Sequence, residues 1–376
     1  MDQQPTLLLF AAAGGPSEIE QAVAGAQWAV AVETIEKALR SGRCERVIVA
    51  TSAAGLIAQL DHLPVIVERD AEPFHFGRQL RDLIRRHGIR RPLYVGGGSA
   101  ALFGAVELAD LCRRLAGAQR AVFPNNFWST DFAGFVPGDT IERIEPPAID
   151  NNLAFLLNRS AGLPEMSLPH SAATQFDIDT PTDLLILSLH HQVGPRARAY
   201  LDALDLETTR LRTLMRMLTD DQAEVLIAGR VGSATWLHLE QDTACRVRLF
   251  SEERGMRASG REERGEVRSL LGFYLQRCDP RGLFQALAAL GDAAIIDSRV
   301  IFAHLGLNLS APDRFHSDLL QAERIADPLA REFTAAAREA PIPVVLGGHS
   351  LVSGGLWALI DAAWHEHDRQ AGRSSR

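Results

Sequence analysis

The segment Phe176–Leu184, with the sequence FDIDTPTDL, holds the residues whose types and spacing point most directly to chemistry. Asp177 and Asp179 are two positions apart, so on an extended segment their carboxylates point to the same side. Two hard oxygen ligands placed in this way can bind one Mg²⁺ beside the oxygens of a triphosphate. The segment is equally a good helix start, with Thr180 or Asp179 as the cap and Pro181 at the first helical position. The motif by itself leaves both interpretations open.

Two glycine-rich stretches in the first half each follow a predicted strand. The first follows the apolar run 6–12 and contains Gly14 and Gly15, and the second follows PLYV at 92–95 and contains Gly97, Gly98 and Ser99. Open α/β sheets bind ligands beyond the carboxyl ends of their strands, and the backbone amides of such loops can hold an anion. We therefore expect these five residues to contact a bound nucleotide.

Asn126 precedes the sequence Phe-Trp-Ser-Thr, which leads to Asp131. Asparagine commonly closes turns by bonding to the nearby backbone, and this is the simpler account of Asn126. Beside an aromatic ring and two hydroxyls, Asn126 can also contact a base or a ribose. Further candidates for a metal or phosphate site are charged residues of the first half, each also explained as a solvated loop charge: Asp131, Arg78, Glu68, Arg69 and Asp70.

Polar residues of the second half gather directly after predicted strands, at 229–233, 251–261, 297–299 and 347–350. Asp297, Arg299 and His349 are the candidate catalytic residues there, because Asp297 can orient His349 as a general acid or base if their strands are neighbours. His349 with the adjacent serine does not make a triad. The Arg- and Glu-rich run after the strand at 245–250 is predicted to be a candidate binding loop at 251–257 and a surface loop at 262–266.

The elements that must position these residues alternate between short apolar runs and helical patterns, which is typical of βαβ units around a mainly parallel sheet. The first half has strand patterns at 6–12, 46–50, 63–67, 92–95, 119–123 and 131–136. The second half has them at 223–228, 245–250, within 293–303 and at 342–346. The sequence thus predicts two α/β domains, one over residues 1–195 and a smaller, Rossmann-like one over residues 205–376, with the boundary within 192–205.

The first domain carries a family resemblance, which rests on FDIDTPTDL and on the order of the segments before it. Residues 5–190 resemble the nucleotidyltransferases that make molybdenum-cofactor guanine dinucleotide and the guanylyltransferases of deazaflavin-cofactor synthesis, which commonly close their nucleotide domain with D-x-D-T-P-x-D-L. The resemblance implies a nucleotide-diphospho-sugar transferase fold, a nucleoside triphosphate and a small-molecule phosphate as partners, and Mg²⁺ held by Asp177 and Asp179.

Two stretches depart from the pattern of that family. The loop after the first strand, AAAGGPSE at 11–18, lacks the arginine and lysine that hold the triphosphate in the family, and no Arg or Lys occurs before Lys37. The stretch 94–99, YVGGGS, lacks the aspartate of the family's G-D-x-P sequence. The missing cation removes a main source of charge stabilisation in the transition state.

Composition sets wider bounds on the function. The chain has 376 residues, a formal charge of −8 and four cysteines in no CxxC pair. The charge argues against a nucleic-acid surface, and the cysteine pattern against a disulfide framework or a zinc site. The apolar run near the start has no basic region before it, and no stretch approaches the ~20 apolar residues of a membrane span. We expect a cytoplasmic protein that binds neither nucleic acid nor membranes.

Three functions remain open at this point. The first is a nucleotidyltransferase-like protein that uses Mg²⁺ to transfer a nucleotidyl group from a nucleoside triphosphate to a phosphorylated small molecule. The second is a catalytically silent protein that binds a nucleotide or metabolite, which the missing cation and aspartate favour. The third is an enzyme whose chemistry lies in the second domain.

Overall fold

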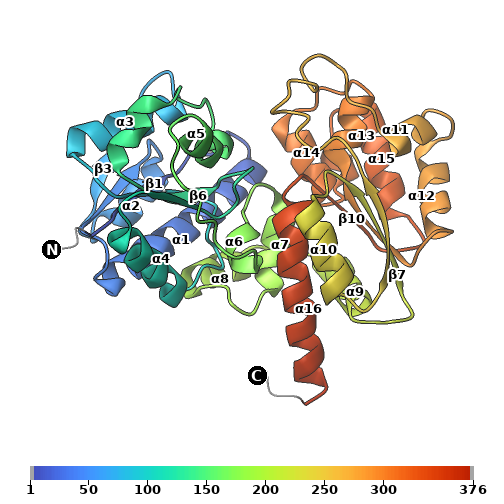
Figure 1. The fold of residues 1–376 in the computed structure, drawn as a ribbon. Helices are drawn as coiled ribbons and strands as arrows, with labels where there is room; N and C mark the ends of the chain where they lie inside the picture. The colour runs from blue at the N-terminus through green and yellow to red at the C-terminus, as the bar shows by residue number, and fades with distance from the viewer. Residues whose placement is uncertain (1–3, 373–376) are drawn as a thin grey trace. The chain divides into compact units, whose positions relative to one another are not determined.

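The computed structural model describes residues 4–372, which form two compact units (Figure 1). The first unit consists of residues 4–15, 24–177 and 194–200, and the second of residues 16–23, 178–193 and 201–372. Each unit has its own mainly parallel sheet with packed helices, so the predicted α/β fold class is confirmed. Within the described residues, no helix is both long enough and apolar enough to cross a bilayer.

The sheet of the first unit has six strands in the order β3-β2-β1-β4-β6-β5. Strand β1 pairs in parallel with β2 and β4, and β2 with β3, whereas β6 is antiparallel to both β4 and β5. The strand order therefore reverses at the β1/β4 pair: β2 and β3 lie on the β1 side, and the strands that follow β4 in the chain lie on the other side. The strands are β1 (Thr6–Phe10), β2 (Arg46–Ala50), β3 (Ile66–Glu68), β4 (Pro92–Gly96), β5 (Ala121–Pro124) and β6 (Phe132–Val136).

Helices cover this first sheet on both faces (Figure 1). Helices α3 and α5 contribute Leu80, Leu83 and Leu157 to one core, which they share with Leu8 and Ile48 of the sheet. Helix α3 begins at a cap in which the His75 side chain accepts from the Arg78 amide, and it ends at a left-handed glycine. The helices that lie wholly or mostly in this unit are α1 (Glu18–Ser41), α2 (Ala54–Leu60), α3 (Phe76–His87), α4 (Ala105–Gly117), α5 (Leu153–Arg159), α6 (Ala172–Gln175) and α8 (Pro195–Asp202).

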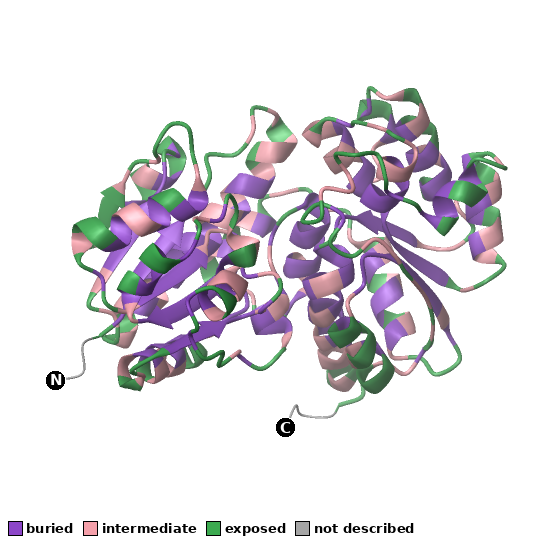
Figure 2. Cartoon of the chain, turned by 45° about the horizontal axis from the view of Figure 1, so that its top comes forward, coloured by how far each residue is buried: buried purple, intermediate pink, exposed green. Residues whose placement is uncertain are grey.

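The second unit has the smaller sheet, with four parallel strands in the order β10-β9-β7-β8. Its strands are β7 (Glu224–Gly229), β8 (Arg246–Ser251), β9 (Ala293–Asp297) and β10 (Val344–Gly347). Figure 2 shows both sheets as buried ribbons under helices whose outer faces are exposed. The helices are α7 (Pro181–Leu189), α9 (Thr209–Leu218), α10 (Ser233–Asp242), α11 (Leu270–Leu275), α12 (Pro280–Ala288), α13 (Ser298–His304), α14 (Ala311–Asp318), α15 (Pro328–Arg338) and α16 (Leu356–Gln370).

Helix α7, which carries the last part of FDIDTPTDL, packs within the second unit. Thr182 Oγ1 donates to the carbonyl of Leu346 at 2.7 Å, and Ser350 Oγ donates to Asp183 Oδ2 at 2.7 Å. Asp177 belongs to the first unit and residues 178–193 to the second, while residues 194–200 return to the first. This division differs from the expected boundary within 192–205, because α7 is buried along most of its length and packs against β10 and α16.

Candidate functional site

A cavity of about 520 Å³ lies at the carboxyl edge of the first sheet, beyond β1 and β4. Residues 11–13 after β1 and residues 97–99 after β4 line it, together with Phe10 and Gly96 at the ends of the two strands. Phe10 and Gly96 are partners in the parallel register. In open α/β sheets, this point, where the direction of connection changes, is where ligands bind.

Gly97 permits the close approach of the two loops that border this cavity. A Cβ atom at Gly97 would lie 3.0 Å from Ala11 Cβ and 3.1 Å from the carbonyl oxygen of Phe10, so a side chain there would push the loops apart. Trp28 Nε1 fixes the loop after β1 by donating to the Ala12 carbonyl at 2.9 Å. Backbone atoms of the loops after β1 and β4 therefore border the cavity, and loops of this kind can hold a phosphate with their amides.

Carboxylates surround the hydroxyl of Tyr94 at the floor of the cavity. The hydroxyl donates to Asp150 Oδ2 at 2.5 Å. The pKa of Tyr94 is raised well above its usual value, first by burial and then by three neighbouring carboxylates, those of Asp150, Asp131 and Asp177. Tyr94 therefore stays protonated and acts as a donor in an acidic site. Asp177 reaches this place because its backbone bridges to Ser99 in antiparallel sense.

Asn125 positions one of these carboxylates. Its side-chain oxygen accepts from the backbone amides of Asp131 at 3.0 Å and Phe132 at 3.1 Å, and its Nδ2 donates to Asp131 Oδ2 at 2.9 Å. The same Nδ2 donates to the carbonyl of Thr174 at 3.0 Å. Asn125 is 1% exposed and thus ties the loop that carries Asp131 to the segment that leads into Asp177.

Aromatic rings form one wall of the cavity. The rings of Phe10, Phe76 and Tyr94 meet edge to face, with centroids 4.8 to 5.5 Å apart. Phe74 and Ile149 also line the cavity, and each is 55% exposed. Exposed apolar side chains beside a polar floor suit a ligand with a flat apolar part and a charged part.

Most of the nucleotide-site residues predicted from sequence line this cavity. Gly97, Gly98, Ser99, Asp131 and Asp177 are among its lining residues, as is Asp70. In the loop after β1, residues 11–13 line it in place of Gly14 and Gly15. Asn126 lies outside the lining, where its side chain donates to Gln175 and accepts from the Trp128 amide in a turn. Glu68 also lies outside, since it pairs with His87 and Arg86.

Tyr94 was not predicted as a site residue, and Asn125 and Asp150 lie in Asn-rich stretches for which the sequence favours turns over contacts to a base or ribose. The one signal in the sequence is Tyr94 itself, because a tyrosine in a buried strand requires a partner for its hydroxyl. Its partner, Asp150, is 56 positions away along the chain, in a stretch whose amino-acid composition favours a turn.

The donor set of this cavity fits a divalent cation. Four aspartates line it, namely Asp70, Asp131, Asp150 and Asp177, and its described lining contains no Lys, Arg or His. Hard carboxylate oxygens are the ligands that Mg²⁺ prefers, and Mg²⁺ usually keeps several waters while binding one or two carboxylates. Asp179, predicted to share the ion with Asp177, is an exposed residue of the second unit.

Two of the candidate catalytic residues of the second unit, Asp297 at the end of β9 and His349 two residues after β10, follow neighbouring strands, and Arg299 lies on α13. Gly347 on β10 is the register partner of Asp297 on β9. The two oxygens of Asp297, however, accept from Arg230 at 2.5 and 3.0 Å. Arg299 likewise donates to both oxygens of Asp318, at 2.8 and 2.6 Å. Both pairs are buried, so Asp297 and Arg299 serve first as ion-pair partners.

Three residues of the second unit meet the distance criterion for a metal site. Among the described residues, the ligand atoms of His190, His191 and Asp361 lie within 4.8 Å of one another. His190 Nδ1 accepts from the Gln192 amide at 3.2 Å, so the neutral ring carries its proton on Nε2. That atom faces Asp361 Oδ2 at 3.1 Å. The cluster is therefore explained as a histidine–aspartate pair.

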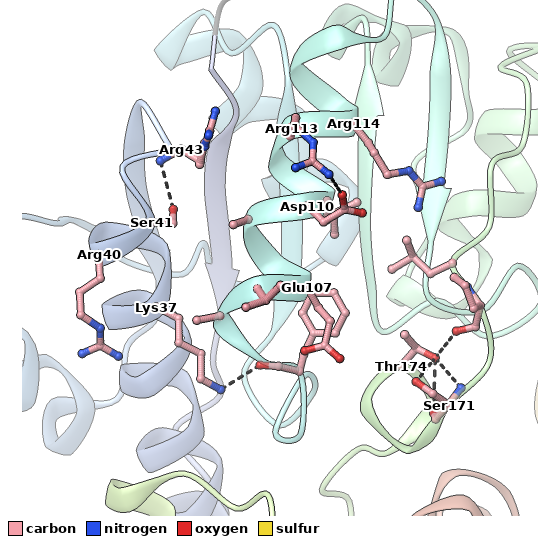
Figure 3. A pocket seen from close by; sticks show the side chains of 17 residues that line it. Lys37, Arg40, Ser41, Arg43, Glu107, Asp110, Arg113, Arg114, Ser171 and Thr174 are labelled. Carbon is pink, nitrogen blue, oxygen red and sulfur yellow. Dashed lines mark hydrogen bonds and ion pairs between the residues drawn. The ribbon is translucent and has the colours of Figure 1, made fainter. Parts of the chain in front are cut away.

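A larger cavity, of about 740 Å³, lies between α1 and α4 (Figure 3). Its charged lining is mainly cationic, with Lys37, Arg40, Arg43, Arg113 and Arg114 against Glu107 and Asp110. Lys37 Nζ donates to the Phe103 carbonyl at 2.9 Å, and Arg113 pairs with Asp110. Burial lowers the pKa of Lys37. Because this cavity lies between helices, away from the loops after β1 and β4, we place the candidate site at the sheet edge.

Comparison with known proteins gives structural matches alone. No family model and no curated protein matches the sequence. One similar solved structure is a cytidylyltransferase from Leptospira borgpetersenii serovar Hardjo-bovis, with a TM-score of 0.38 and 14% identity, covering 53% of this chain and 91% of that chain. Another is CMP:2-keto-3-deoxy-manno-octonic acid synthetase in complex with CTP, with a TM-score of 0.35 and 10% identity, covering 48% of this chain and 95% of that chain.

Proposed function

We propose that the first unit binds a nucleoside triphosphate as its Mg²⁺ complex at the carboxyl edge of β1 and β4, as a nucleotidyltransferase-like protein. The observation that carries the proposal is the combination, in one cavity, of two backbone-lined loops, an aromatic wall and four carboxylates without a cationic side chain in the described lining. A bare triphosphate would be repelled by such a site, whereas a triphosphate that carries Mg²⁺ brings the missing positive charge.

Each part of the cavity has a role in this proposal. The amides of residues 11–13 and 97–99 face the phosphates, and the rings of Phe74 and Phe76 offer a surface for the base. Asp177, with Asp131 or Asp150, holds the ion or its waters. When bound, Mg²⁺ neutralises the triphosphate and orients it for in-line displacement.

The reaction that follows from the family resemblance is nucleotidyl transfer. A phosphate oxygen of the acceptor attacks the α-phosphorus, a new phosphoanhydride bond forms, and pyrophosphate leaves with the electron pair of the broken bond. One observation favours a second candidate, binding without transfer: among residues 4–372, no Lys or Arg lines the cavity to stabilise the charge that develops in the transition state.

Thermal stability in the presence of nucleotides tests the proposal. The full chain is melted with each of the common nucleoside triphosphates, with Mg²⁺ and with EDTA. We expect at least one nucleotide to raise the Tm in Mg²⁺ alone, and Asp177→Ala to abolish the rise. Asp82→Ala, a half-exposed aspartate on α3 outside the cavity, is the matched control, and Asp179→Ala tests the other predicted ligand separately. No rise in Tm with any nucleotide would refute the proposal. For a nucleotide that does raise the Tm, an assay of pyrophosphate release shows whether the protein transfers the nucleotidyl group or only binds the nucleotide.

A further inference from the structure

Five arginines from four elements gather at the carboxyl edge of the second sheet. In this sheet the connection changes direction at the β7/β9 pair, since β8 is added on one side and β10 on the other. Arg230 follows β7, Arg254 and Arg257 follow β8, Arg299 follows β9, and Arg314 lies on α14. The edge of a parallel sheet at such a point is a usual place for a ligand.

Two of these guanidiniums are locked in place by buried carboxylates. Asp297 holds Arg230, and Asp318 holds Arg299, each through two hydrogen bonds. Arg230 and Arg299 are each 7% exposed. Gly229 allows the first pair to form, because a Cβ there would lie 2.3 Å from that of Asp297 and the backbone has a φ of +129°. Each pair is net neutral, and together the two pairs fix the positions of these guanidiniums at the bottom of the edge.

The loop after β8 is also built to hold its arginines. Glu253 adopts a φ of +54°, and its carboxylate accepts two hydrogen bonds from Arg261, both at 2.9 Å, and one from the Arg268 amide at 3.0 Å. Met256 is fully buried against Val267 and Val300. Glu253, with its left-handed backbone, anchors the loop just before Arg254, and the buried Met256 anchors it between Arg254 and Arg257.

Positive charge exceeds negative charge at this edge. Arg257 pairs with Glu262, but within residues 4–372 neither Arg254 nor Arg314 has a carboxylate partner at ion-pair distance. The pKa of Arg314 is lowered, first by burial and then by the guanidiniums of Arg299 and Arg257. A Cβ at Gly232, the cap of α10, would lie 3.5 Å from the guanidinium carbon of Arg254. The charges of Glu262 and Asp179 act on Arg230 and offset part of the excess.

His349 adds a neutral donor to the same edge. Its ring reaches the surface, but the atoms packed around it and the guanidiniums of Arg230, Arg254 and Arg257 lower its pKa to about 4, against the opposing effect of Asp297. At neutral pH the ring is therefore uncharged and keeps one N–H. Arg254 and His349 thus lie on the same edge, and Arg314, near Arg257 and Arg299, donates from Nη1 to the Leu309 carbonyl at 2.6 Å and, in the described part of the chain, keeps its other N–H groups for a ligand. Guanidiniums and an N–H donor are groups that bind a phosphate dianion.

We propose that the carboxyl edge of the second sheet is a binding site for a phosphorylated small molecule, held by Arg254, Arg314 and His349. This site is independent of the Mg²⁺–nucleotide site proposed for the first unit. Arg230 and Arg299 act as positioning residues, since their own carboxylates already occupy them.

Binding of inorganic phosphate and pyrophosphate to the full chain tests this site. Titration calorimetry is carried out in EDTA, so that the Mg²⁺-dependent site does not contribute, at constant ionic strength set with sodium chloride. We expect the wild type to bind these anions. Arg254→Gln should weaken binding by about tenfold, which corresponds to the loss of one charge-assisted hydrogen bond, and Arg314→Gln and His349→Ala should also weaken it. Arg264→Gln, an exposed arginine of the same loop paired with Glu266, is the matched control.

The outcomes separate the possible sources of binding. Equal affinity of the wild type, Arg254→Gln and Arg264→Gln for pyrophosphate would overturn the site, as would no heat with either anion. Loss of binding in Asp177→Ala but not in Arg254→Gln would place the anion in the first unit and would also overturn it. Tighter binding of succinate than of phosphate would overturn the phosphorylated class. The melting temperature of each variant without anion shows that it is folded.

Discussion

The Tyr94 hydroxyl donates a 2.5 Å hydrogen bond to Oδ2 of Asp150, and this bond joins β4 to a short 3-10 helix, Asp150–Asn152, that begins 56 residues later. Tyr94 is 2% exposed, so its hydroxyl has little access to water. Through this bond the floor of the acidic cavity is attached to the central part of the sheet.

Tyr94→Phe removes the hydrogen bond that the Tyr94 hydroxyl donates to the half-buried carboxylate of Asp150. We expect the free energy of unfolding to fall by about 1.5–3 kcal/mol, the usual contribution of a hydrogen bond to a charged group. Urea denaturation measures the change. Tyr274→Phe, an exposed tyrosine of α11, should change stability by less than about 0.5 kcal/mol. Equal losses in both variants would contradict a special role for the Tyr94 bond.

Gly97→Ala tests the close approach of the loops beyond β1 and β4. The new methyl group would press on Ala11 and on the Phe10 carbonyl, and we expect a loss of about 1–3 kcal/mol together with weaker nucleotide binding. A Cβ at Gly117 would have no described atom within 4 Å, so Gly117→Ala is the control. Wild-type nucleotide affinity in Gly97→Ala would show that the shape of this edge is not needed for binding.

Asp297→Asn tests whether the Arg230 pair is structural. The change leaves a buried guanidinium without its counter-charge, and we expect a loss of about 3–5 kcal/mol at pH 7. Burial opposes ionisation of Asp297, but Arg230 outweighs it and holds the pKa of the carboxyl below its usual value. The stabilisation is therefore present above the unfolded-state pKa of about 3.9 and is lost as the pH falls through the folded value.

Denaturation of the wild type and Asp297→Asn across the acid range makes this measurement, and Asp221→Asn, at an exposed position, is the control. A loss below about 1 kcal/mol at pH 7 would leave Asp297 open to the catalytic role expected from sequence.

The buried carboxyl of Asp183 should make the free energy of unfolding depend on pH with the opposite sign. Burial, and then the charge of Asp179, raise the pKa of Asp183 to about 7, although Ser350 and the amides of 179 and 180 donate to it. The folded state thus holds a proton that the unfolded state has released, and stability should fall as the pH rises from about 4 to 7. Asp183→Asn should remove this part of the slope. The same slope in wild type and variant would contradict the assignment.

Much of the fold follows from the sequence, because buried parallel strands are continuous apolar runs. RVIVA and AAIID, for example, are strands β2 and β9 as predicted. The antiparallel placement of β6 beside β4 could not be predicted, since it depends on pairing partners and not on the composition of either strand. The same holds for the division inside FDIDTPTDL, because the packing of α7 on β10 is set by a contact between residues 164 positions apart.

The part of the candidate site that lies in loops after strands could be predicted from the sequence. Gly97, Ser99 and Asp131 lie in the cavity because the carboxyl ends of β4 and its neighbours meet there. For Asp150 and Asn125 the sequence favours turns over ligand contacts. Their hydrogen-bonding roles could not be predicted, because these depend on distant or turn-forming partners. In the second unit, β9 and β10 are neighbours, which is the condition set for an interaction of Asp297 with His349, but no local pattern predicts that Arg230 occupies the Asp297 carboxylate.

The central claim, a Mg²⁺–nucleotide site at the β1/β4 edge, is tested most directly by calorimetric titration of the best-stabilising nucleoside triphosphate into the wild type, Asp177→Asn and Asp82→Asn. We predict binding to the wild type and Asp82→Asn in Mg²⁺, no binding in EDTA, and at least about tenfold weaker binding to Asp177→Asn, as for loss of a charged ligand to the ion. Equal affinity of all three proteins, or equal affinity with and without Mg²⁺, would contradict it.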